Sequence, residues 1–256
     1  MKHEPAEFKY NQNQHLDLYL QNKPDRPLVV CVHGGGFISG DKRDERCRQS
    51  ATLLTEAGFN FASISYSLAP RQDRFRMWPR NLFDLADAIA WLHDHAGDHG
   101  YNFDRLGLLG FSAGCCLSNL YIQGGENIFS AFDYDIQVYR PSALVGFYGP
   151  YDFPSRQEGR RSTDDQLNLE HSPSYWFKRN RHRKPPVLHI QGNRDLIVHP
   201  DQHDMFQNDY ETGGNDFEAV VVDGFGHSFA PQDTNESGRP IDLGPRMTSF
   251  FSKHLI

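Results

Sequence analysis

The sequence lacks the features that mark secreted, disulfide-rich or membrane-spanning proteins. It has only four cysteines in 256 residues. Cys115 and Cys116 are adjacent and Cys31 lies in an apolar stretch, so a disulfide framework is not indicated and a reducing compartment is expected. No stretch approaches the roughly 18 apolar residues of a membrane span, and residues 1–17 lack the apolar core of a secretory signal. We therefore expect a soluble, cytoplasmic protein without a membrane partner.

The chain also lacks an excess of positive charge. Its 26 Lys and Arg residues are outnumbered by 33 Asp and Glu residues, which gives a net charge of −7. Such a balance argues against general affinity for nucleic acid. One basic segment, KRNRHRK at 178–184, precedes Pro185 and Pro186 and is interpreted as a solvated loop rather than a phosphate-binding patch. No nucleic-acid partner is expected.

Thirteen histidines raise the question of a metal site. His93 and His95 point to different faces of a helix, so they cannot meet one ion. His199 and His203 have i, i+4 spacing, but no third ligand follows at a suitable distance in the sequence. Solvated helix ends account for both groups, and we expect neither a metal nor another cofactor.

Hydrophobic patterning predicts alternating strands and helices. Residues 15–20 alternate between apolar and polar, as in an edge strand, whereas residues 27–32 form a continuous apolar run typical of a strand covered on both faces. One helical stripe lies within 82–92, with Asp84 and Asp87 off it. Further strands are expected at 59–66, 106–111, 143–148, 187–191 and 217–222, and further helices at 113–122, at 200–212 and after Pro245. This order predicts a single α/β domain, residues 1–256, with a mostly parallel sheet covered by helices on both faces.

Ligands bind such sheets at the carboxyl ends of the strands, so the residues at those ends matter most. The segment GFSAG at 110–114 follows one strand. It fits a helix cap at Ser112, but also the G-x-S-x-G turn that lifts a nucleophilic serine above a sheet. The segment HGGGF at 33–37 follows another strand, and glycines allow its backbone N–H groups to approach a ligand closely. Asp195 and His227 each follow a further strand.

The order of these motifs along the chain indicates a shared function. Ser112, Asp195 and His227 occur in the chain order Ser, Asp, His, each just after a strand, with the triple-glycine loop earlier in the chain. This order and placement are typical of α/β-hydrolases. In that arrangement Ser112 is the nucleophile, His227 the base, and Asp195 the acid that orients the histidine.

Three stretches, HGGGFISGDKRD, ISYSLAP and the run from WPRNLFDL to GFSAG, resemble the hormone-sensitive-lipase-like esterases. The chain also resembles the small bacterial acetylxylan and feruloyl esterases, over about residues 15–255. The resemblance implies an α/β-hydrolase fold and backbone oxyanion donors at Gly35, Gly36 and Ala113. The chain departs from those families at Ser67, where arginine is usual. A second departure, Phe111 where an acid is common before the nucleophile in the hormone-sensitive-lipase relatives, favours the carbohydrate-esterase-like relatives.

The segment 151–184 is expected to be a small cap-like insertion near the serine. Its aromatic residues Tyr151 and Trp176 are either ordinary packing or a wall of the substrate site. Together with Phe37 and Phe111 they are our candidates for substrate binding. The segment is too short and polar to present the broad apolar face of a lipase lid.

The function predicted from these residues is a serine carboxylester hydrolase that cleaves small or short-acyl esters, with acetyl or aryl esters of carbohydrates among the candidates. An aryl-formamidase or another small amide hydrolase with the same triad is the nearest alternative. A non-catalytic binding protein on a hydrolase scaffold is a remote one, because such proteins usually lose a triad member. The expected partner is a small-molecule ester, and the sequence does not fix the oligomeric state.

Overall fold

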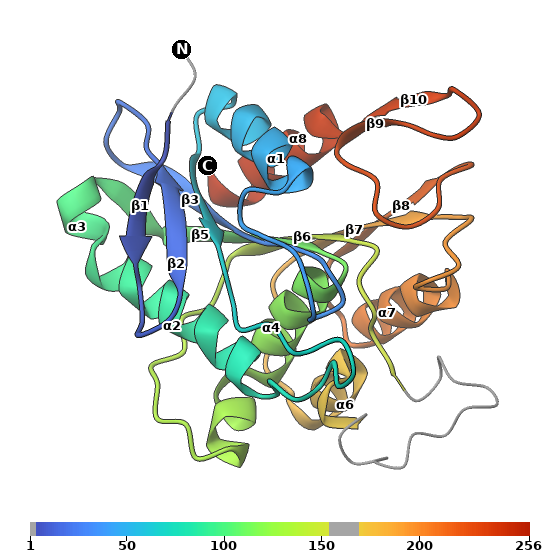
Figure 1. Cartoon of the computed structure of the whole chain (residues 1–256), viewed down its shortest axis with the longest axis horizontal. Helices are drawn as coiled ribbons and strands as arrows, with labels where there is room; N and C mark the ends of the chain where they lie inside the picture. Colours follow the sequence, from blue (N-terminus) through green and yellow to red (C-terminus); the bar gives the residue numbers. More distant parts are fainter. Residues whose placement is uncertain (1–3, 154–168) are drawn as a thin grey trace.

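A central eight-stranded sheet organises the chain, in the order β1-β2-β4-β3-β5-β6-β7-β8 (Figure 1). The structure is a computed structural model that describes residues 4–153 and 169–256. The strands from β4 to β8 in this order run parallel, and β1 and β2 are antiparallel to their neighbours. The strands are β1 (Ala6–Lys9), β2 (His15–Tyr19), β3 (Arg26–Val32), β4 (Asn60–Ile64), β5 (Tyr101–Phe111), β6 (Ala143–Phe147), β7 (Val187–Gly192) and β8 (Phe217–Val222).

Helices cover both faces of the sheet. Figure 1 shows α1 and α8 on one face and α2, α4 and α7 on the other. A hairpin of β9 (Gln232–Thr234) and β10 (Pro240–Asp242) extends from one end of the molecule. The helices are α1 (Glu45–Glu56), α2 (Arg80–Asp94), α3 (Ala96–His99), α4 (Ala113–Ala131), α6 (Pro173–Arg179), α7 (Asp201–Thr212) and α8 (Gly244–Leu255).

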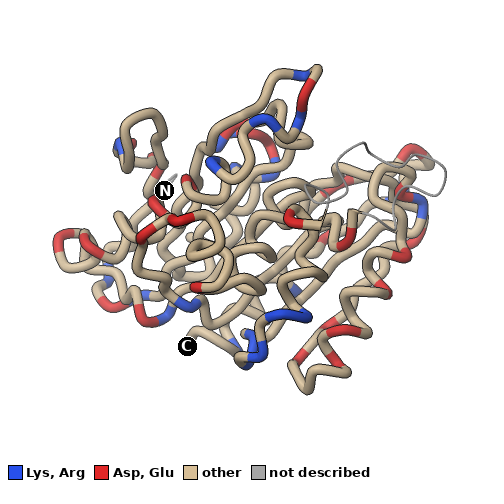
Figure 2. Tube along the Cα trace, turned by 90° about the horizontal axis from the view of Figure 1, so that it is seen from below, with Lys and Arg blue, Asp and Glu red and all other residues tan. Residues whose placement is uncertain are grey.

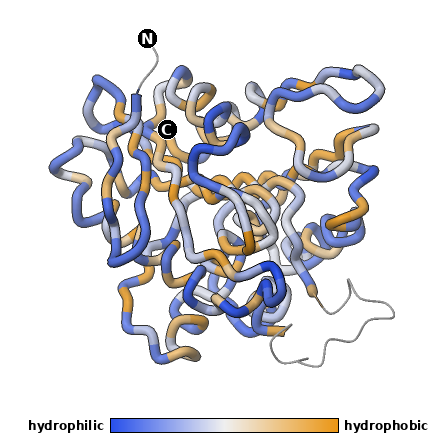
Figure 3. Tube along the Cα trace, in the orientation of Figure 1, coloured by the Kyte–Doolittle hydropathy of each residue, from blue (hydrophilic) through white to orange (hydrophobic). Residues whose placement is uncertain are grey.

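The apolar side chains of β3 belong to two separate hydrophobic cores, one on each face of the sheet. These side chains alternate, so that Leu28, Val30 and Val32 face α2 and α4, whereas Val29 and Cys31 face α1 and α8. Figure 2 shows that charged residues lie mainly on outer loops and helices, and Figure 3 shows hydrophobic segments along the central strands. A strand buried on both faces needs apolar residues at every position, which is why the apolar run of β3 shows no alternation.

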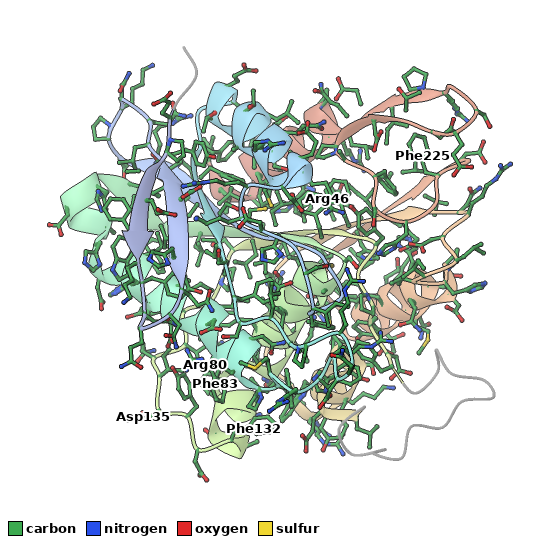
Figure 4. All side chains as sticks on the ribbon, viewed as in Figure 1. Arg46, Arg80, Phe83, Phe132, Asp135 and Phe225 are labelled. Atoms are coloured by element: carbon green, nitrogen blue, oxygen red, sulfur yellow. The ribbon has the colours of Figure 1, made fainter. Side chains whose placement is uncertain are left out.

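Six elements were not predicted from the sequence: α3, α6, β9 and β10, and the pair β1 and α1 nearer the start of the chain. The strand at 15–20 was expected at the edge of the sheet, which is wrong, because β1 pairs with it and forms the edge. Helix α1 was also missed, although Asp44 caps it by accepting a hydrogen bond from the N–H of Cys47 at 2.9 Å. Arg46, labelled in Figure 4, pairs with Asp44 at 2.7 Å. Elements β1 and α1 are too short or too polar for their periodicity to stand out.

Asp84 lies off the apolar stripe of α2, as expected, yet it is buried. Its carboxylate accepts hydrogen bonds from Arg80, from the side chain of Asn11 and from the backbone N–H of Ser67. A buried carboxylate needs such partners because it has lost its water. Asp84 therefore ties the segment after β4 to helix α2.

The cap-like insertion expected at 151–184 is only partly visible, since residues 154–168 lie outside the described residues. In the described remainder, α6 packs against α4 and also contacts α7. The basic segment 178–184 is not wholly a solvated loop, because Asn180 and Lys184 are buried. No helix in the described part of the chain is both long and apolar enough to span a bilayer.

A buried ion pair fixes the chain that follows the triple-glycine loop. Asp17 on β2 is fully buried, and its carboxylate contacts both Arg43 and Lys42. Lys42 also pairs with Glu7 of β1 at 2.6 Å, and its carbonyl accepts a hydrogen bond from the hydroxyl of Ser63 on β4. These contacts hold the end of the loop against three strands, so the loop is attached to the sheet at both of its ends.

Candidate active site

Ser112 stands on a strained turn between β5 and α4. Its backbone has φ 50° and ψ −115°, a conformation that non-glycine residues rarely adopt. Its N–H donates a hydrogen bond to the carbonyl of Phe147 at 2.9 Å, which fixes the turn to strand β6. Ser112 does occupy the N-cap position of α4, as the alternative interpretation expected, but its side chain makes no capping hydrogen bond to the helix.

The glycines on either side of the serine are required by close packing. A Cβ at Gly110 would lie 2.5 Å from the Cα of Cys115, and a Cβ at Gly114 would lie 2.1 Å from the carbonyl oxygen of Val32. Both neighbours are backbone atoms that cannot move without distorting the sheet or the helix. The spacing of the G-x-S-x-G motif therefore reflects two places where backbones meet without room for a side chain.

The three residues predicted from strand ends form one hydrogen-bonded chain. Ser112 Oγ lies 2.8 Å from His227 Nε2, and His227 Nδ1 lies 2.7 Å from Asp195 Oδ2. Two other acids follow the same strands, but their hydrogen bonds go elsewhere: Asp223 is exposed and binds Asn193 and Arg239, and Asp201 begins helix α7 and lies beside His199. The topology thus joins residues that lie 115 and 32 positions apart in the chain.

Asp195 is held by four donors. Its Oδ1 accepts from the backbone N–H groups of Ile197 and Val198, at 2.8 and 2.9 Å, and its Oδ2 accepts from His227 and from Gln191 Nε2 at 3.1 Å. Burial alone would raise the pKa of Asp195, but the hydrogen bond and charge of His227 and the two N–H groups lower it below its ordinary value. The carboxylate is therefore ionised at neutral pH. Gln191 was not predicted, although it lies near the end of the strand that precedes Asp195.

Tyr148 is a second residue that the sequence analysis missed. Its ring meets that of His227 edge-on, with 4.7 Å between the centroids, and its hydroxyl donates to the carbonyl of Phe229 at 2.6 Å. It thereby contacts both the imidazole and the loop that carries it. No motif surrounds Tyr148. The one feature of the sequence that could have identified it is its position directly after strand β6.

The triple-glycine loop lies against the serine turn. A Cβ at Gly34 would lie 3.3 Å from the Cβ of Ser112, so no side chain separates the two segments. Gly35 and Gly36 have φ values of +124° and +63°. Among the hydrogen bonds between described residues, none uses the N–H groups of Gly35, Gly36 or Ala113. These three amides are therefore available for a ligand beside the serine.

The side chain of His33 stabilises this loop. Its buried ring stacks on Tyr66 with 4.3 Å between centroids, and its Nδ1 lies 2.7 Å from the carbonyl oxygen of Gly34. Tyr66 in turn donates its hydroxyl proton to the carbonyl of His33 at 3.0 Å. Burial lowers the pKa of His33, so the ring is neutral and donates from Nδ1 to Gly34. These contacts tie the start of the loop to Tyr66, in the segment after β4.

The four aromatic residues chosen for substrate binding are buried, with 0 to 5% of their surface exposed. Phe111 is wrong as a substrate contact, because its ring lies in the core against Phe147. Tyr151 stacks on Phe206 in the core, and Trp176 donates from Nε1 to the carbonyl of Glu170. Phe37 also belongs to the core, although it directly follows the glycine loop. Apolar character alone does not distinguish a pocket wall from a core position.

The histidines do not form a metal centre within the described residues, which contain no group of three or more His, Cys, Asp or Glu side chains placed to hold an ion. The interpretation of His203 as part of a solvated helix end is wrong. It is buried and its Nδ1 lies 2.7 Å from Nδ1 of His189 on β7. Burial lowers the pKa of both rings. His199 precedes α7 and is exposed, so the two do not share a helix face.

A mostly parallel sheet covered on both faces, with a serine on a strained strand–turn–helix junction, is characteristic of the α/β-hydrolase fold. The BD-FAE family model matches residues 16–210 of this sequence. The chain therefore belongs to the BD-FAE family.

Individual relatives agree with this assignment. The chain is 29% identical over 210 residues to the probable carboxylic ester hydrolase LipM of Mycobacterium tuberculosis H37Rv, covering 74% of this chain and 47% of LipM. It is 28% identical over 207 residues to the esterase LipC of the same organism, covering 73% and 48%. The chain thus spans about half the length of the curated relatives it matches.

A solved carbohydrate esterase from gut microbiota, in truncated form, superposes with a TM-score of 0.79 at 18% identity, covering 98% of this chain and 97% of the other. The esterase Est2 of Thermogutta terrifontis has a TM-score of 0.77 at 20% identity, covering 97% and 90%. At such low identity, these two structures establish the fold.

The glycine loop yields a stability prediction. A Cβ at Gly35 would lie 1.9 Å from the carbonyl oxygen of Ser39, whereas a Cβ at Gly36 meets nothing within 4 Å. Gly35→Ala should lower the free energy of unfolding by more than about 3 kcal/mol, and Gly36→Ala by about 1 kcal/mol, the cost of a left-handed alanine. Urea unfolding of the two variants beside the wild type measures the difference. Equal losses would show that the loop packs differently.

Proposed function

We propose that this protein is a serine carboxylester hydrolase that works through an acyl-enzyme on Ser112. The observation that carries the proposal is the hydrogen-bonded chain from Ser112 through His227 to Asp195, with contacts of 2.8 and 2.7 Å. A serine hydroxyl is a weak nucleophile unless a base accepts its proton, and a neutral imidazole at this distance is suited to do so. The strained turn also supports the proposal, because it places the serine hydroxyl near backbone N–H groups that make no hydrogen bond within the described residues.

The proposed reaction proceeds in two halves. His227 accepts the proton of Ser112 while the serine oxygen attacks the ester carbonyl, and it then protonates the departing alcohol. Asp195 holds the imidazole in the required tautomer and stabilises its positive charge. Water next attacks the acyl-enzyme with His227 again as base, which releases the acid and restores the serine hydroxyl.

The negative charge of the tetrahedral intermediate is assigned to the N–H groups of Gly35, Gly36 and Ala113. Amides fixed before the reaction stabilise developing charge without reorganisation, and one such donor lowers the barrier by about 3–4 kcal/mol. The bracing of the loop by His33 and Tyr66 supports this role, since it holds the donors in place. The relatives support the same chemistry: Est2 is described in one structure as phosphorylated by paraoxon, a modification that an activated serine in this chain would also undergo.

Small or short-acyl esters are the proposed substrates, with acetyl or aryl esters of carbohydrates as candidates. The fold relative described as a carbohydrate esterase supports this class, as do Est2 structures described with propionate and butyrate bound. An aryl-formamidase remains the second candidate, because the same serine, histidine and amides would serve an N-formyl group. The triple glycine favours esters.

The first test is replacement of the nucleophile. Ser112→Ala should reduce kcat for a small ester by on the order of 10⁶-fold, because no acyl-enzyme can form. The variant should remain folded, since only the hydroxyl is removed. A fluorophosphonate should label the wild type at residue 112 and leave the variant unlabelled. Labelling at another residue, or retained activity, would reject the mechanism and favour a binding protein on this scaffold.

The second test separates the orienting acid from its alternatives. Asp195→Asn should reduce kcat by about 10⁴-fold, because an amide at this position stabilises the wrong histidine tautomer. Asp223→Asn and Asp201→Asn are matched controls that remove one carboxylate each at exposed positions, and both should keep kcat within about twofold. Steady-state kinetics on one ester suffices. A larger loss at 201 or 223 than at 195 would contradict the assignment.

The substrate class requires a panel in which acyl length and alcohol vary independently. We expect kcat/KM to be highest for acetyl to butyryl esters and to fall for long acyl chains, with N-formyl aryl amines hydrolysed more slowly than matched aryl esters. The comparison uses one enzyme preparation, with Ser112→Ala as the background control. Highest kcat/KM on long-chain triglycerides would reject the small-ester class, and highest kcat/KM on N-formyl aryl amines would favour the formamidase.

A further inference from the structure

A cavity of about 350 Å³ lies at the end of the sheet remote from Ser112. It is bordered by Ser142 and Pro186, which directly precede strands β6 and β7, so it opens at the amino ends of the strands. Helix α4 connects the two ends of the sheet. Gly125 in this helix borders the cavity, and the 12 residues from Ala113 to Gly125 span about 18 Å. The cavity is therefore separate from the candidate active site.

The cavity is formed where α4 is kinked. Gly125 has φ 50° and ψ −143°, which interrupts the helix and leaves carbonyl groups before it without helical partners. Three side chains of the basic segment satisfy them: Asn180 Nδ2 donates to Gly124 at 2.7 Å, His182 Nε2 to Ile122 at 3.2 Å, and Lys184 Nζ to Gln123 at 3.5 Å. The segment 180–184 is thus built into the wall of the cavity.

Positive charge collects at this wall. Lys184 is buried, and its ammonium group donates to the carbonyl oxygens of Asn180 and Gln123 rather than to a carboxylate. Burial, and then the charge of Arg140, lower the pKa of Lys184 to about 8. Arg183 also lines the cavity and, among the described residues, pairs with no carboxylate. Glu126 pairs with Arg140 at 3.4 Å, but both side chains are exposed, so this pair is weak.

The remaining wall is mainly apolar. It is formed by the side chains of Tyr121, Ile122, Val138, Pro141 and Pro185. Cavities of about this size, with apolar walls and a few converging polar groups, are typical of small-molecule sites. Arg183 without a carboxylate partner and the weakly paired Arg140, beside apolar walls, favour a ligand that combines an anionic group with an apolar body.

We propose that this cavity is a second binding site, which takes a small organic monoanion with a carboxylate on an aromatic or aliphatic body. The carboxylate lies toward Arg183 and Arg140, and the apolar body lies against Tyr121 and the prolines. In a chain with a net charge of −7, most of the surface repels such an anion, so the basic wall provides local selectivity. The site does not depend on the proposed esterase activity.

Benzoate is the probe, titrated into the full-length protein by isothermal calorimetry. An aromatic carboxylate of this size should bind with a Kd of about 1 mM. Benzyl alcohol has the same apolar body without the charge, and inorganic phosphate has charge without an apolar body. Both should bind at least about tenfold more weakly than benzoate. Equal affinity for either control would overturn the proposal, as would absence of saturable benzoate binding.

A matched pair of variants locates the site. Arg183→Glu should weaken benzoate binding by at least about tenfold, because it replaces a cation of the wall by an anion. Arg181→Glu makes the same change of charge two residues away, outside the cavity lining, and should stay within about twofold of the wild type. Both side chains are exposed, so both variants should fold, which circular dichroism verifies.

The same pair distinguishes the cavity from other locations. Benzoate bound beside Ser112 would keep its affinity in both variants, and a general electrostatic effect would weaken binding equally in both. Either result would overturn the proposal. The measurement involves no turnover, so failure of the second site and failure of the esterase mechanism are separately visible.

Discussion

The close approach of α4 to the end of β3 is the constraint on which the rest of the site depends. At Gly114 a side chain would lie 2.1 Å from the carbonyl oxygen of Val32. Helix and strand meet backbone to backbone, so the chain must turn sharply between β5 and α4, and Ser112 occupies the strained position of that turn. The turn places the serine beside the glycine loop, because the loop begins directly after β3. Ser112 and the glycine loop are thus brought together by the same close packing.

The order of the strands in the sheet brings Asp195 and His227 to Ser112. Strands β5 to β8 are parallel neighbours, so their carboxyl ends lie along one edge, and the loops after β7 and β8 carry Asp195 and His227 to that edge. Buried polar contacts then fix the orientations. Four donors hold Asp195, Tyr148 contacts both the imidazole and its loop, and His33 holds the glycine loop. Each buried polar group needs a partner, and these partners position the site.

Helix α4 has different roles at its two ends. Its first residue follows the nucleophilic turn, and its kink at Gly125 leaves carbonyl groups that the basic segment must satisfy. The segment therefore packs against the helix, and Lys184 becomes buried, with its ammonium group bonded to carbonyl oxygens rather than to a carboxylate. A structural need at the kink thus creates the charged wall of the second cavity. The segment stabilises the helix at its kink and lines the cavity.

The sequence by itself determined the fold class and the three residues of the hydrogen-bonded chain. Apolar runs with little alternation predicted strands buried on both faces, and Ser112, Asp195 and His227 could be located because each directly follows such a strand. The spacing of Gly110 and Gly114 was visible in the sequence, and a Cβ at Gly110 would meet the nearby backbone of Cys115, whereas the contact of Gly114 with Val32 comes from the tertiary structure. These features depend on short segments whose spacing is visible in the chain.

Only the tertiary structure decided which aromatic and basic residues face a cavity and which lie in the core. Phe111 and Trp176 are as apolar in the core as they would be in a pocket wall, so composition could not separate the two. Tyr148 and Gln191 belong to no motif, and their roles arise from partners on other strands. Lys184 and His203 are buried because distant segments cover them, contrary to their polar sequence neighbourhoods. Burial and orientation depend on contacts between segments far apart in the chain, which local patterning does not encode.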